Sequence, residues 1–205
     1  MFKAINTRKI YLVRHCKPQV QDGTHLCIGK KDIPLSDKGR EQALQLVKYF
    51  SDYNINGIYS SPLKRAKETA EIVAGKEYNV VTKNNFSELD VGKWDGLSFD
   101  EVKQRYPKEY EERGNNLENY IVEGGESMAM CRKRAMAEMY KTINESAGDI
   151  VIVAHAGVIR TILSSLLGIS MNKTFNYKID YGSISILNYD EKVLKPHEIG
   201  LSILK

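Results

Sequence analysis

Two histidines in this chain each follow a short, wholly apolar run of residues. His15 follows the run 10–13 and Arg14, and His155 follows the run 150–154. Apolar runs of this length are typical of strands buried on both faces of a parallel sheet, and such sheets bind ligands beyond the carboxyl ends of their strands. An imidazole can act there as a nucleophile, an acid or a base near neutral pH. The pattern therefore predicts that two residues far apart in sequence share one pocket.

A third apolar run, 58–60, leads into a segment that favours anion binding. Ser61 is suited to cap a helix and Pro62 to be its first residue, so Arg65 is expected in the first helical turn. Free backbone N–H groups and the positive end of the helix dipole favour an anion at that place. Arg14, Arg65 and the two histidines would together surround a small, highly charged oxyanion.

Composition narrows the class of protein. The chain has 205 residues, 42% of them hydrophobic, and no low-complexity stretch divides it, so we predict one domain over residues 1–205. A formal net charge of +4 without a long basic run favours small anionic ligands over nucleic acid. No apolar segment is long enough for a signal peptide or a membrane span, so we expect a soluble protein that binds no membrane. No feature of the sequence indicates an oligomeric state.

The three cysteines, Cys16, Cys27 and Cys131, do not form a disulfide or zinc-ribbon pattern. Their number is odd and no CxxC spacing occurs, which indicates the reducing cytoplasm as the location of the protein. A metal site built from His15, Cys16, His25 and Cys27 is an alternative, because all four are soft or borderline ligands. The adjacent pair His15 and Cys16 lacks the usual ligand spacing.

Strand and helix patterns alternate along the chain and indicate an α/β fold. Helices are expected at 36–50, 62–73, 98–115 with a break near Pro107, 127–144 and 157–167. A short strand is expected at 79–82 and a terminal hairpin at 184–189 and 193–199. The segments 19–34 and 86–96 should be irregular, and the highly charged 98–115 should form a lid or a flank.

Six segments, taken together, resemble the histidine phosphatase superfamily, also called the phosphoglycerate mutase-like family. They occur in the order of that family, cover nearly the whole chain, and are 12–15, 29–39, 60–70, 88–96, 125–127 and 153–157. The resemblance implies a mostly parallel central sheet flanked by helices on both faces. Within the family the chain is most similar to the short phosphatases, such as the α-ribazole phosphatase type.

The resemblance also implies a role for each site residue. His15 would be the nucleophile that accepts the phosphoryl group, and Arg14, Arg65 and His155 would hold the phosphoryl oxygens. Glu88 would protonate the leaving alkoxide and then assist the attacking water, which requires a carboxyl group that is protonated at working pH. His15, Glu88 and His155 are thus the catalytic candidates. Neither a metal nor a cofactor is implied.

The chain departs from the family pattern beside the first histidine. Cys16 stands where the family usually has glycine, Lys17 where it often has glutamate, and Gln21 where many members have asparagine. We expect Cys16 to narrow the space beside the phosphate, and Lys17 to add positive charge at the pocket mouth and favour a substrate with a second anionic group. Lys17, Gln21 and Ala156 are the candidate substrate-binding residues.

A catalytic thiol at Cys16 is a rival interpretation, because Arg14, His15 and Lys17 would lower the pKa of that thiol. Cysteine phosphatases carry an arginine six positions after the nucleophile. The corresponding positions after the three cysteines are Asp22, Ile33 and Ala137. The sequence therefore lacks that phosphate-binding loop.

The sequence predicts a metal-independent phosphomonoesterase that hydrolyses a small phosphorylated metabolite through a phosphohistidine on His15. Two alternatives remain open, namely phosphoglycerate mutase-type phosphoryl transfer and a non-catalytic member that binds a phosphorylated ligand. Glu126 and Ser127 are further candidates for substrate contact, although Ser127 is equally suited to cap the helix that follows.

Overall fold

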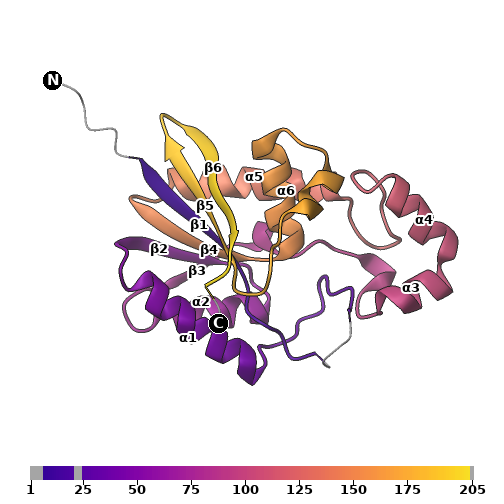
Figure 1. Cartoon of the computed structure of the whole chain (residues 1–205), viewed down its shortest axis with the longest axis horizontal. Helices are drawn as coiled ribbons and strands as arrows, with labels where there is room; N and C mark the ends of the chain where they lie inside the picture. The colour runs from indigo at the N-terminus through magenta and orange to yellow at the C-terminus, as the bar shows by residue number, and fades with distance from the viewer. Residues whose placement is uncertain (1–6, 21–24, 204–205) are drawn as a thin grey trace.

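The computed structural model describes residues 7–20 and 25–203, and a six-stranded sheet forms its centre. The strands are β1 (Arg8–Arg14), β2 (Ile55–Ser60), β3 (Val80–Thr82), β4 (Asp149–Ala154), β5 (Ile184–Asp190) and β6 (Val193–Leu201). Their order across the sheet is β3-β2-β4-β1-β5-β6 (Figure 1). The strands β1 to β4 run parallel, whereas β5 and β6 are antiparallel to their neighbours. The prediction of a mostly parallel α/β sheet is confirmed.

Helices connect the parallel strands at the predicted places. They are α1 (Asp37–Phe50), α2 (Lys64–Ala74), α3 (Phe99–Arg105), α4 (Pro107–Asn115), α5 (Met128–Asn144) and α6 (Ala156–Leu167), with short 3-10 turns at Asn84–Phe86, Gly92–Trp94 and Met171–Asn176. Ser127 caps α5 by accepting a hydrogen bond from the Met130 N–H, so the capping interpretation of Ser127 is confirmed. Within the described ranges, no helix is both long enough and apolar enough to cross a membrane.

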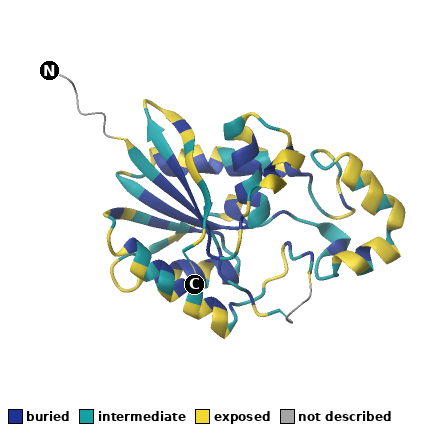
Figure 2. Ribbon diagram, viewed as in Figure 1, coloured by how far each residue is buried: buried dark blue, intermediate teal, exposed yellow. Residues whose placement is uncertain are grey.

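The buried strands divide the core between two faces. Ile10 and Leu12 of β1 belong to the cluster beneath α5 and α6, whereas Tyr11 and Val13 belong to the cluster beneath α1 and α2. All four side chains are fully buried, and Figure 2 shows the same burial along the central strands. Full burial of an apolar side chain of this size contributes about 1.5–3 kcal/mol to folding. Helices on both faces are therefore required to cover the sheet.

The charged segment 98–115 forms a flank. α3 begins with a capping box between Ser98 and Glu101, and Pro107 begins α4 because proline is suited to the first helical position. A small cluster of Cys27, Trp94 and Val102 fixes this flank to the loops before and after it. Figure 1 shows α3 and α4 standing apart from the helices that cover the sheet.

The start of α2 differs from the prediction. The helix begins at Lys64 with Leu63 at the N-cap, two residues later than expected, and Leu63 makes no side-chain capping bond. Ser61 lies two positions before this N-cap, and its hydroxyl contacts the ring of His155 at 2.7 Å. Arg65 still lies in the first helical turn, as predicted.

Candidate active site

The parallel strands bring the predicted site residues to one edge of the sheet. β1 pairs with β4, and β4 with β2, so the carboxyl ends of the three strands are adjacent. Backbone hydrogen bonds continue past the strands, from the His15 N–H to the Ala154 carbonyl at 2.9 Å and from the Ser61 N–H to the Val153 carbonyl at 3.0 Å. His15 and His155 lie side by side as a result, with ring centroids 5.0 Å apart.

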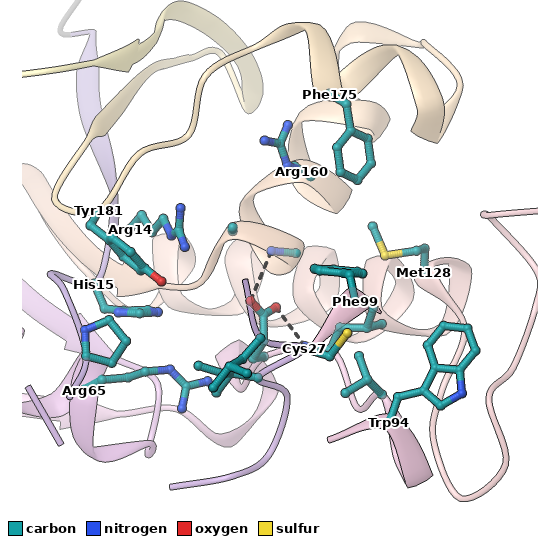
Figure 3. A pocket seen from close by; sticks show the side chains of 18 of the residues that line it. Arg14, His15, Cys27, Arg65, Trp94, Phe99, Met128, Arg160, Phe175 and Tyr181 are labelled. Carbon is teal, nitrogen blue, oxygen red and sulfur yellow. Dashed lines mark hydrogen bonds between the residues drawn. The ribbon is translucent and has the colours of Figure 1, made fainter. Parts of the chain in front are cut away.

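A cavity of about 300 Å³ lies at this edge of the sheet. Five of the predicted site residues line it, namely Arg14, His15, Arg65, Glu88 and Ala156. Figure 3 shows Arg14, His15 and Arg65 on the same side of this cavity. His155 does not line the cavity and is fully buried.

The hydrogen bond of His15 fixes which ring nitrogen can attack. Nδ1 lies 2.7 Å from the carbonyl oxygen of Cys16, and a carbonyl only accepts, so Nδ1 carries the proton and Nε2 keeps its lone pair. Burial, followed by the charges of Arg65 and Arg14, lowers the pKa of His15 well below its usual value. The ring is therefore neutral at neutral pH, which is the form that a nucleophile requires.

His155 forms its contact through the other ring nitrogen, Nε2. Its Nε2 lies 2.7 Å from the Ser61 hydroxyl, which also accepts the Leu63 N–H at 3.3 Å. The other ring nitrogen, Nδ1, is buried and has no hydrogen-bond partner among the described residues. Burial and then the charge of Arg65 lower the pKa of His155 well below its usual value, so the ring is neutral at neutral pH.

Carbonyl oxygens hold the two arginines without neutralising them. Arg14 donates to the Ile179 carbonyl at 2.7 Å, and its guanidinium carbon lies 3.8 Å from the ring centroid of Tyr181. Arg65 is 1% exposed and donates to the carbonyls of Lys31 and Gly29 at 2.8 and 2.9 Å. No carboxylate among the described residues forms an ion pair with either guanidinium. Both cations are thus available to bind an anion.

Glu88 lies at the amino end of α6. Its carboxylate accepts hydrogen bonds from the backbone N–H groups of Leu89 at 2.8 Å, Gly157 at 3.2 Å and Val158 at 3.3 Å. These donors fix the carboxyl group at the wall of the cavity, where it can reach a leaving group. The Glu88 carboxylate packs closely against Gly157, because a β-carbon on Gly157 would lie 2.5 Å from Glu88 Oε1.

Arg134 fixes the loop that carries Glu88. From α5 its guanidinium donates to the carbonyls of Asn85 at 2.7 Å, Ser87 at 2.8 Å and Glu88 at 3.1 Å, and it pairs with the carboxylate of Glu126. Glu126 also accepts the Asp90 N–H at 3.0 Å. Glu126 therefore supports the loop and does not line the cavity.

Two expectations about Cys16 are wrong. Its side chain points away from the cavity into the fully buried core beneath α1 and α2, so it does not narrow the space beside the phosphate. Burial raises the pKa of the thiol to about 12, whereas its charged neighbours were expected to lower it. The Cys16 N–H donates to the Thr69 hydroxyl at 3.1 Å, which fixes the turn after β1.

The remaining candidates have different positions. Ala156 lines the cavity, whereas Lys17 does not, and the Lys17 carbonyl accepts the Ser36 N–H at 3.0 Å before α1. Gln21 lies outside the described residues. Over 7–20 and 25–203, no group of three His, Cys, Asp or Glu side chains is arranged to hold a metal ion, so the structure does not assemble the alternative metal site.

Tyr181 and Arg160 are among the cavity residues that the sequence reasoning missed. Tyr181 packs on Arg14, with its ring centroid 5.5 Å from that of His15, and it follows a 3-10 turn that no periodicity predicted. Arg160 donates to the carbonyls of Thr174 and Tyr177. Its place in the first turn of the predicted helix after His155 was a signal that could have identified it.

Comparisons with known proteins agree with this geometry. Residues 10–200 match the family model described as the histidine phosphatase superfamily, branch 1. The chain is 30% identical over 187 residues to phosphoserine phosphatase 1 of Hydrogenobacter thermophilus, an alignment that covers 90% of this chain and 88% of that protein. It is 33% identical over 147 residues to the uncharacterized phosphatase PhoE of Bacillus subtilis, with 69% of each protein covered.

Solved structures have the same fold. YhfR of Bacillus stearothermophilus has a TM-score of 0.86 at 25% identity, over 96% of this chain and 99% of that one. The α-ribazole phosphatase of Shigella flexneri has a TM-score of 0.83 at 22% identity, over 94% and 96% of the two chains. The predicted phosphoglycerate mutase-like fold is confirmed. Because the family model spans nearly the whole chain, the protein belongs to the histidine phosphatase superfamily, branch 1.

Proposed function

We propose that the protein is a metal-independent phosphomonoesterase, which hydrolyses a small phosphorylated metabolite through a phosphohistidine intermediate on His15. The observation that carries this proposal is the tautomer of His15. Its Nδ1–H donates to the Cys16 carbonyl, so its Nε2 lone pair is free beside two arginines that lack a carboxylate partner in the described chain. Relatives named phosphatases, including phosphoserine phosphatase 1, support the same reaction class.

In the first step, the lone pair of His15 Nε2 attacks phosphorus and the bond from phosphorus to the ester oxygen breaks. Glu88 gives its proton to the leaving alkoxide. The resulting phosphoimidazolium keeps its Nδ1–H bond to the Cys16 carbonyl, which stabilises the new positive charge. Arg14 and Arg65 bind the phosphoryl oxygens, and His155 donates its Nδ1–H to them.

In the second step, water attacks phosphorus and the bond from phosphorus to Nε2 breaks. Glu88 accepts the proton of this water, and inorganic phosphate leaves with neutral His15 restored. The two guanidinium groups supply the positive charge that a divalent cation supplies at other phosphoryl-transfer sites.

Phosphoglycerate mutase-type transfer is the second candidate. The chain is 28% identical over 185 residues to the probable phosphoglycerate mutase GpmB of Salmonella choleraesuis. A mutase returns the phosphoryl group to its substrate, whereas a phosphatase releases it to water. The non-catalytic alternative was suggested by Cys16 and Lys17, which depart from the family pattern, and neither side chain lines the cavity.

The test measures phosphate release from p-nitrophenyl phosphate and a panel of phosphorylated metabolites in the presence of a chelator. His15→Ala is the test variant, and His25→Ala, at an exposed histidine, is the matched control. We expect the native protein and the control to release phosphate, His15→Ala to be inactive, and rapid quenching to leave one phosphoryl group on His15. Absence of release from every ester, with exchange between 2- and 3-phosphoglycerate, would make the protein a mutase.

A further inference from the structure

The cavity has two chemically different halves. Figure 3 shows Arg14, His15 and Arg65 on one side and Cys27, Phe99 and other apolar residues on the opposite side. The first half holds Arg14, His15 and Arg65, which the proposed phosphoryl reaction uses. The second half holds Cys27, Trp94, Phe99 and Met128. A substrate that filled only the charged half would leave this apolar wall in contact with water.

Two aromatic side chains at this cavity are unusually exposed for their size. Phe99 of α3 is 44% exposed and Phe175 is 56% exposed, and both line the cavity. Apolar side chains that are exposed at the wall of a cavity can be covered by an apolar part of a ligand. Because Phe99 and Phe175 come from different segments and line the same cavity, an apolar, planar part of the substrate would cover both.

A cation without an acidic partner also lines the cavity. Arg113 of α4 has its guanidinium carbon 5.7 Å from the ring centroid of Trp94. Among the described residues, no hydrogen bond or ion pair to its guanidinium is found, whereas nearby Glu109 is paired with Lys93 at 2.8 Å. Burial lowers the pKa of Arg113, and no carboxylate of the described residues offsets this effect. A cation at a cavity wall without an acidic partner is suited to bind an anionic ligand through charge-assisted hydrogen bonds.

We propose that the substrate is a phosphomonoester whose alcohol has an apolar, planar body and a second oxyanion, and that Arg113 binds this second oxyanion. The inference rests on the proposed phosphatase function and specifies its substrate class. A guanidinium fits a carboxylate and a phosphate equally well, so either group satisfies the proposal. Arg113 thus has the role that the sequence suggested for Lys17, whose side chain does not line the cavity.

The experiment compares kcat and KM for matched esters. Biphenyl-4-yl phosphate is compared with its 4′-carboxy and 4′-phosphono derivatives, with phenyl phosphate and 4-carboxyphenyl phosphate as a shorter pair and phosphoserine as a small polar ester. The variants are Arg113→Gln and Arg113→Lys. The matched control is Arg105→Gln, which removes an exposed arginine of α3 that pairs with Glu101 at 3.0 Å outside the cavity.

We expect the native protein to prefer at least one oxyanion-bearing aryl ester over its parent by roughly ten- to hundredfold in kcat/KM, mainly through KM. In Arg113→Gln this ratio should fall to about one, in Arg113→Lys it should be intermediate, and in Arg105→Gln it should not change. The derivative with the larger increase in kcat/KM over the parent ester shows whether Arg113 prefers a carboxylate or a phosphate-like group.

Three results separate the possible failures. Equal kcat/KM for the charged and parent esters in the native protein, or a preference that persists in Arg113→Gln, would overturn the role of Arg113. A higher kcat/KM for phosphoserine than for the aryl esters would overturn the apolar body. If no ester, including p-nitrophenyl phosphate, releases phosphate, the phosphatase proposal itself fails. Thermal unfolding of each variant shows whether it is folded when assayed.

Discussion

The carboxylate of Glu88 packs against Gly157, which donates its backbone N–H to Oε2 at 3.2 Å and leaves no room for a side chain of its own. A β-carbon at this position would lie 2.5 Å from Glu88 Oε1. We therefore predict that Gly157→Ala displaces the general acid. Hydrolysis of an alkyl phosphate, whose leaving group needs a proton, should slow by about 10²-fold or more, whereas p-nitrophenyl phosphate should be affected less.

Gly114→Ala is the matched control for this substitution. Gly114 lies near the end of α4, where a β-carbon meets nothing within 4 Å, so the variant should retain activity on both esters. It should also be more stable by up to about 1 kcal/mol, because alanine favours the helix. An equal loss on the alkyl and nitrophenyl esters in Gly157→Ala would contradict displacement of the acid. Steady-state kcat for the two esters decides the question.

Arg134 is predicted to be a positioning residue for Glu88. It donates to the carbonyls of Asn85, Ser87 and Glu88 from one planar guanidinium, a geometry that lysine cannot reproduce. Arg134→Lys should lower kcat for alkyl phosphates by roughly tenfold or more with little change in KM, because phosphate binding does not involve this loop.

Arg132→Gln provides the comparison for Arg134. Arg132 lies on the same helix and forms a partly exposed ion pair with Glu118 at 2.6 Å, so its loss should leave kcat unchanged. If Arg134→Lys raised KM for all esters and left kcat intact, Arg134 would not act through Glu88. The ratio of alkyl to nitrophenyl turnover gives a readout that a general loss of stability does not change.

The sequence was sufficient to predict the sheet and to bring together the residues of the charged half of the cavity. Apolar runs before His15 and His155 indicated strand ends, and the parallel order of α/β sheets brings such ends together. The contact of the Ser61 hydroxyl with His155 could not be predicted, because the two residues lie 94 positions apart in sequence. Tyr181 was missed because a 3-10 turn and an irregular segment precede it, and neither has a periodic pattern.

The direction of the Cys16 side chain could not be predicted from the sequence motif, for another reason. Successive residues alternate between the faces of a sheet, but this alternation ends at Arg14, the last residue of β1. The contacts of Cys16 with the core beneath α1 and α2 depend on how the following turn is fixed by Thr69. The substitution of glycine by cysteine therefore affects packing and not the cavity.

Cys16→Gly is predicted to change stability without changing specificity. It removes a fully buried side chain from the core, so the free energy of unfolding should fall by roughly 1–3 kcal/mol. KM for each ester should stay within about twofold of the native value. Cys16→Ala, which keeps the β-carbon, should be destabilised less. An increase in kcat in Cys16→Gly would instead support the alternative that the native chain is a non-catalytic member of the family.

The buried histidines predict how stability depends on pH. Burial and the nearby arginines lower the pKa of His15 and His155 in the folded protein, so between those lowered values and about 6.5 the unfolded chain binds more protons. The free energy of unfolding should therefore fall as the pH falls below about 6.5, by up to about 1.4 kcal/mol per pH unit for each histidine. Urea denaturation between pH 7.5 and 5 measures the slope of the free energy of unfolding against pH. His155→Gln should reduce it by about half. A slope that His155→Gln does not alter would show that His155 is protonated alike in the folded and unfolded protein.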